Sequence, residues 1–82
     1  MKSLSQSQQK YMIDLGERLR SIRRALGLSQ AQLAIDANME ISQISRIERG
    51  VINTSVGTLL QISAVLKVDI SELLPKSQFN QD

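Results

Sequence analysis

The stretch SQAQLAIDANMEISQISRIERG, residues 29–50, contains the start and stop signals of two short helices. Ser29 followed three residues later by Gln32 is the pattern of a capping box, which begins a helix. Asn38 tolerates the left-handed conformation that ends a helix, and Gly50 supplies a second stop of the same kind. The stretch therefore predicts a helix-turn-helix, two helices of about nine residues joined by a tight turn. Many helical domains contain such a corner, so the corner alone does not identify a function.

The second of these helices, residues 41–49, has two chemically different faces. At about 100° per residue, Ile44 and Ile47 fall together and define its buried side. The opposite face is polar and cationic and contains no acid; it consists of Ser42, Gln43, Ser45, Arg46 and Arg49. Such a face suits a helix in the major groove of DNA, where Arg and Gln read base edges and Ser reaches phosphate. An ordinary solvated helix face has a similar composition, so that alternative stays open at this point.

Glu48 falls beside the two isoleucines of the same helix, where an unpaired carboxylate is costly. Arg23, in the helical segment that precedes residue 29, lies at the edge of the apolar stripe of that segment. We expect a bidentate ion pair between Arg23 and Glu48 that locks the first helix to the third. The role of this pair is structural, and removal of either partner leaves a buried charge.

Similar patterns on both sides of residues 29–50 extend the helical prediction. Leucines and isoleucines recur at helical spacing before Gly27, Ser55 has the chemistry of an N-cap, and Asp69 begins a last helix that Pro75 stops. The expected helices cover about residues 11–26, 29–37, 41–49, 55–66 and 69–74. We therefore predict a compact all-α domain of five short helices.

The two ends of the chain are polar. Residues 1–10 are rich in Ser and Gln and are expected to form a flexible N-terminal lead, with a helix extension over residues 6–9 as the alternative. Residues 75–82 begin with the only proline and are expected to form a C-terminal tail. Residues 11–74 then remain as a single domain.

The composition excludes several classes of protein. The chain has 82 residues, no Cys, no His and a formal net charge of +2. Without these side chains it lacks thiolate zinc sites, cysteine nucleophiles and the commonest general base, so we expect no enzymatic activity, no metal and no cofactor. No apolar run approaches the ~18–20 residues that span a bilayer, and no stretch resembles a signal peptide. We expect a cytoplasmic protein with no membrane partner.

Two motifs at a set distance from each other resemble those of a known family. They are Ser29-Gln30-x-x-Leu33-Ala34 and the block Ser-Arg-Ile-Glu-Arg-Gly at residues 45–50. On these motifs, residues from about 15 to 74 resemble the lambda-repressor-like, Cro/Xre-type helix-turn-helix family. The resemblance implies a five-helix DNA-binding domain that docks as a homodimer on a two-fold-related operator, with residues 41–49 in the major groove. The function so implied is sequence-specific binding of double-stranded DNA by a transcriptional regulator of the repressor or controller type.

The resemblance also implies roles for individual residues. It agrees with the internal ion pair between Arg23 and Glu48. The positions that face bases in the family are occupied here by Ile41, Ser42, Gln43 and Arg46, and Ile41 suits the methyl group of thymine. The residues expected at the DNA backbone are Gln30, Ser45, Arg49 and Asn53.

Apolar residues near the C-terminus exceed what a thin core needs. We hypothesise that they form the dimer interface, which would then consist of Ile70, Leu73, Leu74 and Phe79. The alternative function is that of a small helical protein-interaction module, such as an antitoxin or adaptor, with a toxin or a polymerase as candidate partner. Large exposed apolar residues on the helix at residues 41–49 would favour that alternative.

Overall fold

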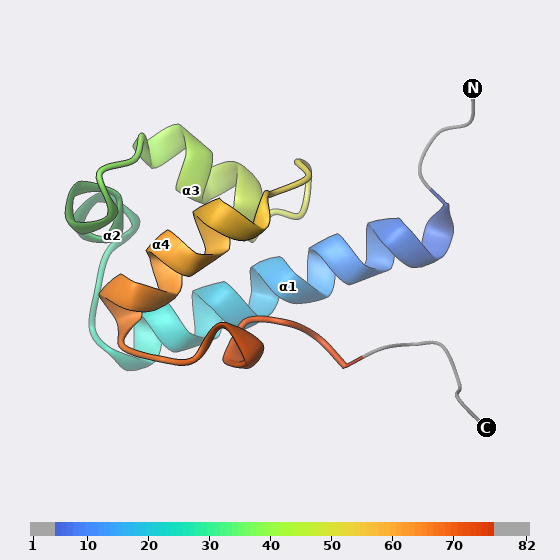
Figure 1. Ribbon diagram of the computed structural model, residues 1–82. Coiled ribbons are helices and arrows are strands. Elements are labelled where there is room, and N and C mark those ends of the chain that lie inside the picture. The colour runs from blue at the N-terminus through green and yellow to red at the C-terminus, as the bar shows by residue number, and fades with distance from the viewer. Residues whose placement is uncertain (1–4, 77–82) are drawn as a thin grey trace.

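The computed structural model describes residues 5–76, which form helices joined by short turns (Figure 1). The elements are α1 (Gln6–Ala25), α2 (Gln30–Ala37), α3 (Ile41–Glu48), α4 (Val56–Leu66) and the 3-10 helix η1 (Ile70–Glu72). Residues 5–76 contain no strand, so the predicted all-α class is confirmed for this part of the chain. Within the same residues, no helix is long and apolar enough to cross a membrane.

The helices gather around the C-terminal half of α1, and the first turns of α1 extend beyond the bundle (Figure 1). α3 packs against both α1 and α2, while α4 packs against α2 and η1. The four α-helices and the residue that follows η1 each contribute a fully buried side chain to the core. These side chains are Leu19, Leu33, Ile44, Ile62 and Leu73. One small core therefore holds α2 and α3 at a set angle to each other.

The expected start and stop signals act where they were predicted around the helix-turn-helix. Ser29 Oγ accepts a hydrogen bond from the Gln32 backbone N–H at 3.0 Å, and Ser55 caps α4 in the same way. The other half of the predicted capping box does not form, because the Gln32 side chain donates to Asp36 at 2.8 Å. Asn38 ends α2 in the left-handed conformation with φ of 56°, and Gly50 follows α3 with φ of 71°. The left-handed turn at Asn38 therefore redirects the chain between the end of α2 and the start of α3.

The prediction of a fifth α-helix is wrong, because η1 is a single 3-10 turn. Asp69 accepts a hydrogen bond from the Ser71 N–H at 2.8 Å, whereas a capping box would have used Glu72. Pro75 has no N–H to donate and disfavours the helical conformation of the residue before it. Only the tighter i→i+3 hydrogen bonds therefore form before the chain turns away.

Residues 6–10 are helical, so the alternative of a helix extension over residues 6–9 is confirmed and the flexible lead is wrong for residues 6–10. Ser5 and Gln8 form a reciprocal capping box, with distances of 2.9 and 3.1 Å between side-chain oxygens and backbone nitrogens. Further along the same extension, the Tyr11 hydroxyl donates to the Pro75 carbonyl oxygen at 2.9 Å. This bond ties the first turns of α1 to the segment that follows η1.

Gly16 marks the closest approach of α1 to α3. A Cβ atom at this position would overlap the carbonyl oxygen of Ile47 and would lie 2.5 Å from that of Glu48. The absence of a side chain thus allows α1 to lie directly on the C-terminal carbonyl groups of α3. This contact fixes the end of α3 that carries Glu48.

Candidate nucleic-acid interface

The division of α3 into a buried and a polar side is confirmed. Ile44 is completely buried and Ile47 is 2% exposed. The polar side is solvent-accessible: Ser42, Gln43, Arg46 and Arg49 are exposed and Ser45 is half-buried. Ile41, at the first turn, has 50% of its surface exposed and is the only large apolar side chain on this side of α3. The surface that α3 presents is thus cationic and rich in hydrogen-bonding groups.

Gln43 has an additional task that follows from its position at the start of α3. Its Oε1 accepts a hydrogen bond from the Glu40 backbone N–H at 3.0 Å. The amide carbonyl is therefore engaged, and the Nε2 group remains to donate outward. On the last turn, Arg49 Nε donates to Ser45 Oγ at 3.3 Å, which holds the two predicted backbone-contacting residues side by side.

The predicted ion pair between α1 and α3 is confirmed. Arg23 Nε lies 2.6 Å from Glu48 Oε2 and Arg23 Nη2 lies 3.0 Å from Glu48 Oε1, which is a bidentate geometry. Arg23 Nη1 also donates to the Leu28 carbonyl oxygen at 2.8 Å, so the same guanidinium fixes the entry to α2. The two residues are 7% and 3% exposed. The pair therefore connects three elements of the core.

The pair also changes the titration of both groups. Burial by itself would raise the pKa of Glu48, but the hydrogen bonds from Arg23 and Gln30 and the nearby positive charge outweigh burial and hold this pKa below its ordinary value. The hydrogen bond to Glu48 raises the pKa of Arg23. Both groups are charged near neutral pH.

Two further residues reach Glu48, and sequence reasoning did not find either of these contacts. Gln30 Nε2 donates to Glu48 Oε1 at 2.9 Å, and Arg20 Nε lies 3.5 Å from the same oxygen. The only signal for Arg20 was its position three residues before Arg23, which places both on one side of α1. The predicted contact of Gln30 with phosphate stays a prediction, but its side chain lies against the buried pair.

Asn53 lies in the loop between α3 and α4, where it is exposed. It borders an apolar cleft of about 210 Å³ whose lining includes Tyr11, Met12 and Leu74. Within the described residues, the buried Thr54 hydroxyl oxygen in the same lining has no hydrogen-bond partner. The loop is thus anchored by apolar contacts on its inner side, while Asn53 stays accessible on the surface.

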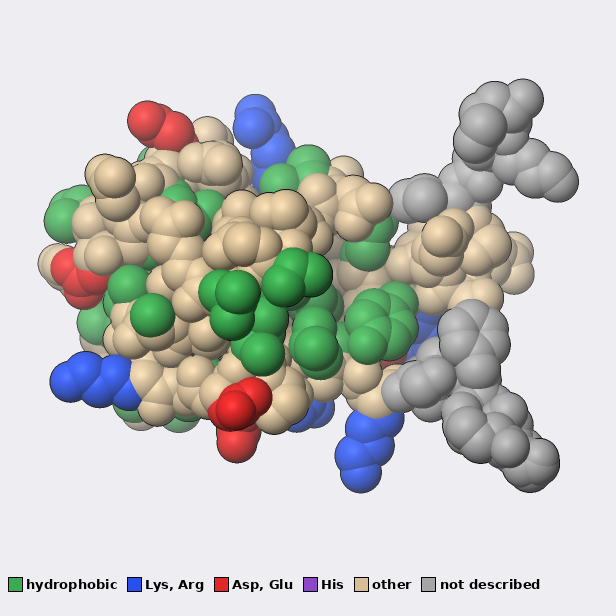
Figure 2. Space-filling view, in the orientation of Figure 1, with side chains coloured by type: hydrophobic (Ala, Val, Ile, Leu, Met, Phe, Trp, Pro, Cys, Tyr) green, Lys and Arg blue, Asp and Glu red, His purple; other side chains and the backbone are tan. Residues whose placement is uncertain are grey.

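The predicted dimer interface needs correction. Leu73 is completely buried in the core of its own chain, so its side chain has no surface with which to contact a second copy. Ile70 and Leu74 are half-buried, and Phe79 lies outside the described residues. Figure 2 shows hydrophobic side chains gathered over α4 and the η1 region. The most exposed large apolar side chains of α4 are those of Val56 and Leu60, at 66% and 51%.

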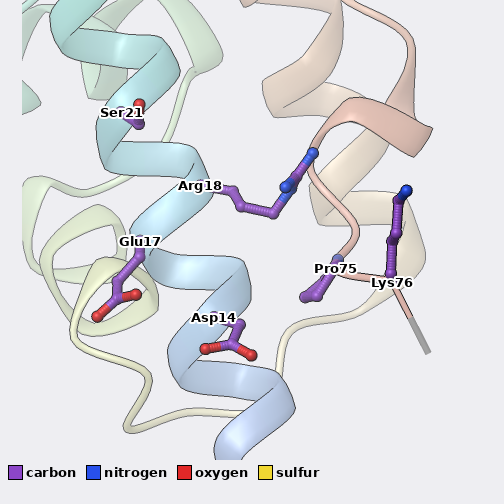
Figure 3. A pocket seen from close by; sticks show the side chains of 6 residues that line it. All are labelled: Asp14, Glu17, Arg18, Ser21, Pro75 and Lys76. Carbon is purple, nitrogen blue, oxygen red and sulfur yellow. The ribbon is translucent and has the colours of Figure 1, made fainter. Parts of the chain in front are cut away.

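A hollow of about 410 Å³ lies between α1 and the segment after η1 (Figure 3). Its lining carries mixed charges, from Asp14, Glu17, Arg18 and Lys76. Arg18 reaches across it and donates to the Glu72 carbonyl oxygen at 3.0 Å, while Glu17 points to the other side of α1 (Figure 3). Asp14 pairs with Lys10 at 3.1 Å. The Arg18 contact ties α1 to η1, and the Asp14–Lys10 pair lies along the surface of α1 itself.

Comparison with known proteins gives consistent matches. The family that matches residues 14–74 is described as a helix-turn-helix domain. The transcriptional regulator SlrR of Bacillus subtilis is 42% identical over 60 residues, which cover 72% of this chain and 40% of SlrR. The immunity repressor protein of Bacillus phage phi105 is 35% identical over 60 residues, which cover 73% of this chain and 42% of the repressor. The match therefore spans less than half the length of either relative.

Solved structures show the same arrangement of helices. The restriction-modification controller protein C.AhdI from Aeromonas hydrophila has a TM-score of 0.75 and 35% identity, covering 77% of this chain and 96% of C.AhdI. SinR, described as the master regulator for biofilm formation and solved in complex with DNA, has a TM-score of 0.69 and 37% identity. That likeness covers 72% of this chain and 95% of the SinR chain.

Proposed function

The chain belongs to the helix-turn-helix domain family, and from this premise we propose that it binds double-stranded DNA sequence-specifically and regulates transcription. In this proposal α3 lies in the major groove, with its polar side toward the bases. The matched relatives are named a transcriptional regulator and an immunity repressor, and SinR was solved with DNA. These names support the proposal that this chain, which matches only part of the first two relatives, has the same function.

The observation that carries the proposal is the exposed side of α3. Apart from Ile41 its side chains are polar, it has no acid, and Ile44 and Ile47, which anchor the helix, are on the opposite side. The major groove is about 12 Å wide and admits such a helix. Arg46 then serves as a bidentate donor to guanine, the commonest specific contact, and Ile41 covers a thymine methyl group.

Gln43 fits the same scheme with a restriction. Because one lone pair of its Oε1 accepts from the Glu40 N–H, the Nε2 group is the part of Gln43 that this bond leaves fully free for a base edge. A bidentate contact to adenine would need the second lone pair of the same oxygen beside Nε2, whereas a single donation from Nε2 suits the oxygen atoms of guanine or thymine. Ser42 completes the base-facing set, and the residues proposed for the DNA backbone are Gln30, Ser45, Arg49 and Asn53.

We further propose that the protein binds DNA as a homodimer through α4. Val56, Leu60 and Ala64 recur every four residues, so they lie on one face of α4, and all three are exposed. α4 contains no charged residue. Ile70, in the η1 turn that packs against α4, and Leu74 are half-buried and retain part of their surface. A two-fold interface there would present two copies of α3 to successive major grooves.

Sedimentation velocity tests the dimer. Leu60→Glu introduces a charge at the centre of the stripe and is expected to shift the protein to the monomer. Ile35→Glu is the matched control, because Ile35 is 70% exposed on α2 and lies outside the proposed interface. Two variants with the same oligomeric state would contradict the interface on α4.

The exposed apolar stripe on α4 also favours the second candidate function, a protein-interaction module whose partner covers α4. Anisotropy titration of a random-sequence duplex at several salt concentrations separates the two. DNA binding predicts an affinity that falls steeply as salt rises, because phosphate contacts release counterions. A chain that does not bind duplex even at low salt would favour the protein-interaction module.

A further inference from the structure

Two arginines contact the carboxylate of Glu48, which can neutralise only one of them. Its Oε2 contacts Arg23 Nε, while its Oε1 contacts Arg23 Nη2, Gln30 Nε2 and Arg20 Nε. Two guanidinium groups therefore face one carboxylate, which leaves a net charge of about +1 at the junction of α1, α2 and α3. Within the described residues, no second carboxylate pairs with either arginine.

The two arginines differ in how their donors are used. Arg23 has an 8% exposed side chain, and its nitrogens donate to Glu48 and to the Leu28 carbonyl oxygen. The Arg20 side chain is 41% exposed, and its Nε is 3.5 Å from Glu48. Among the described residues, neither Nη group of Arg20 donates to a protein acceptor. Because Arg23 neutralises Glu48, the surplus charge lies on the accessible Arg20.

Arg20 and Gln30 converge on the same oxygen atom, so their side chains are neighbours. Gln30 begins α2, and it is one of the residues proposed to contact the DNA backbone. We propose that Arg20 is a further phosphate-binding residue, whose Nη groups bind a DNA phosphate next to Gln30. The proposal rests on the proposed function, since it names an additional contact between α1 and the same duplex.

The position of Arg20 is well suited to this task. The contact of Arg20 with Glu48 Oε1 is made by Nε, so both Nη groups are left without a protein acceptor among the described residues. Guanidinium groups bind phosphate through two parallel N–H groups, and the Nη edge offers such a pair. A partner that merely neutralised Glu48 would use more of its donors and would lie closer than 3.5 Å, as Arg23 does.

The salt dependence of binding to a random-sequence duplex tests the proposal. Each neutralised phosphate contributes about 0.9 to the slope of log affinity against log salt. Arg20→Gln is therefore expected to reduce the slope by about 0.9, so that the advantage of the wild type shrinks about 3.5-fold between 50 and 200 mM salt. Arg20→Lys, which keeps the charge, is expected to retain the wild-type slope.

Arg24→Gln is the matched control, because Arg24 is exposed on the same helix and makes no contact with Glu48 among the described residues. A reduced slope in Arg20→Gln alone supports the proposal. A wild-type slope in Arg20→Gln, even if its melting temperature falls, overturns it and leaves Arg20 a structural partner of Glu48. Equal loss in both variants also overturns it, since long-range attraction would then explain the effect. A wild-type protein without salt-dependent binding contradicts the proposed function itself.

Discussion

Replacing Glu48 by leucine leaves the buried Arg23 guanidinium without its carboxylate. Arg23 stays charged at any accessible pH and keeps only the Leu28 carbonyl oxygen as an acceptor. Loss of one partner of a buried ion pair costs about 3–5 kcal/mol, and the near-complete burial of both side chains places Glu48→Leu at the upper end. Arg23→Met is expected at the lower end, because Gln30 and Arg20 still donate to the carboxylate.

The double variant Arg23→Met with Glu48→Leu makes this prediction quantitative. A hydrophobic replacement of a whole buried pair is often neutral or stabilising. The unfolding free energy of the double variant is therefore expected to lie within about 1–2 kcal/mol of the wild-type value, although the single effects sum to about 8 kcal/mol. Such an interaction energy distinguishes a buried pair from two independent contacts.

Urea unfolding followed by circular dichroism measures all four proteins. At a typical slope of 1–3 kcal/mol per molar urea, each single variant is expected to lower the midpoint by about 2 M. A constant concentration of sulfate keeps the weaker variants folded. Lys10→Ala, which breaks the exposed pair with Asp14, is the control and is expected to cost less than about 0.5 kcal/mol. Single effects below about 1 kcal/mol, or additive effects in the double variant, would refute the reasoning.

Three further predictions concern specificity and pH. Arg46→Ala is expected to cost about 1–3 kcal/mol at a cognate site and to relax the base preference at one position, as measured by competition with single-base variants; an equal loss on every sequence would contradict base reading. Gln43→Glu keeps an acceptor for the Glu40 N–H, so the melting temperature is expected to stay unchanged. The preferred base is expected to change to cytosine, because cytosine donates to a carboxylate. An unchanged base preference in a binding selection would show that Gln43 does not read a base. The folded pKa of Glu48 lies below its unfolded value, so its stabilising effect is complete above the unfolded pKa and is lost as pH falls through the folded one. Unfolding free energies measured from neutral to acid pH are expected to fall more steeply for the wild type than for the Arg23→Met, Glu48→Leu double variant, and parallel curves would exclude this contribution.

Local signals in the sequence predicted the fold wherever one short segment decides the outcome. The Ser29 cap, the left-handed Asn38 and the Gly50 stop are each set by residues within four positions, and all three occur. Ser5 and Gln8 form the same kind of pattern, but the polar composition around them also suits a flexible lead, so composition alone did not decide where α1 begins. The last helix failed because Pro75 is close enough to limit it to one 3-10 turn.

Residues that act across elements were harder to predict. The Arg23–Glu48 pair was found because each residue falls on the apolar side of its own helix, and a buried charge requires a partner. The contacts of Arg20 and Gln30 with Glu48 depend on how α1, α2 and α3 meet, which no single helical pattern encodes. Leu73 was assigned to an interface because a count of apolar residues does not separate core from surface.

Selection of bound sequences from a random duplex pool tests the central proposal, that α3 reads DNA as part of a two-fold dimer, most directly. The expected result is enrichment of a two-fold-symmetric sequence with half-site centres about 10 base pairs apart, one helical turn. Loss of that preference at one position of each half-site in the Arg46→Ala protein would assign the reading to α3. A pool that shows no enrichment after repeated rounds, from a protein that is folded, would contradict sequence-specific binding.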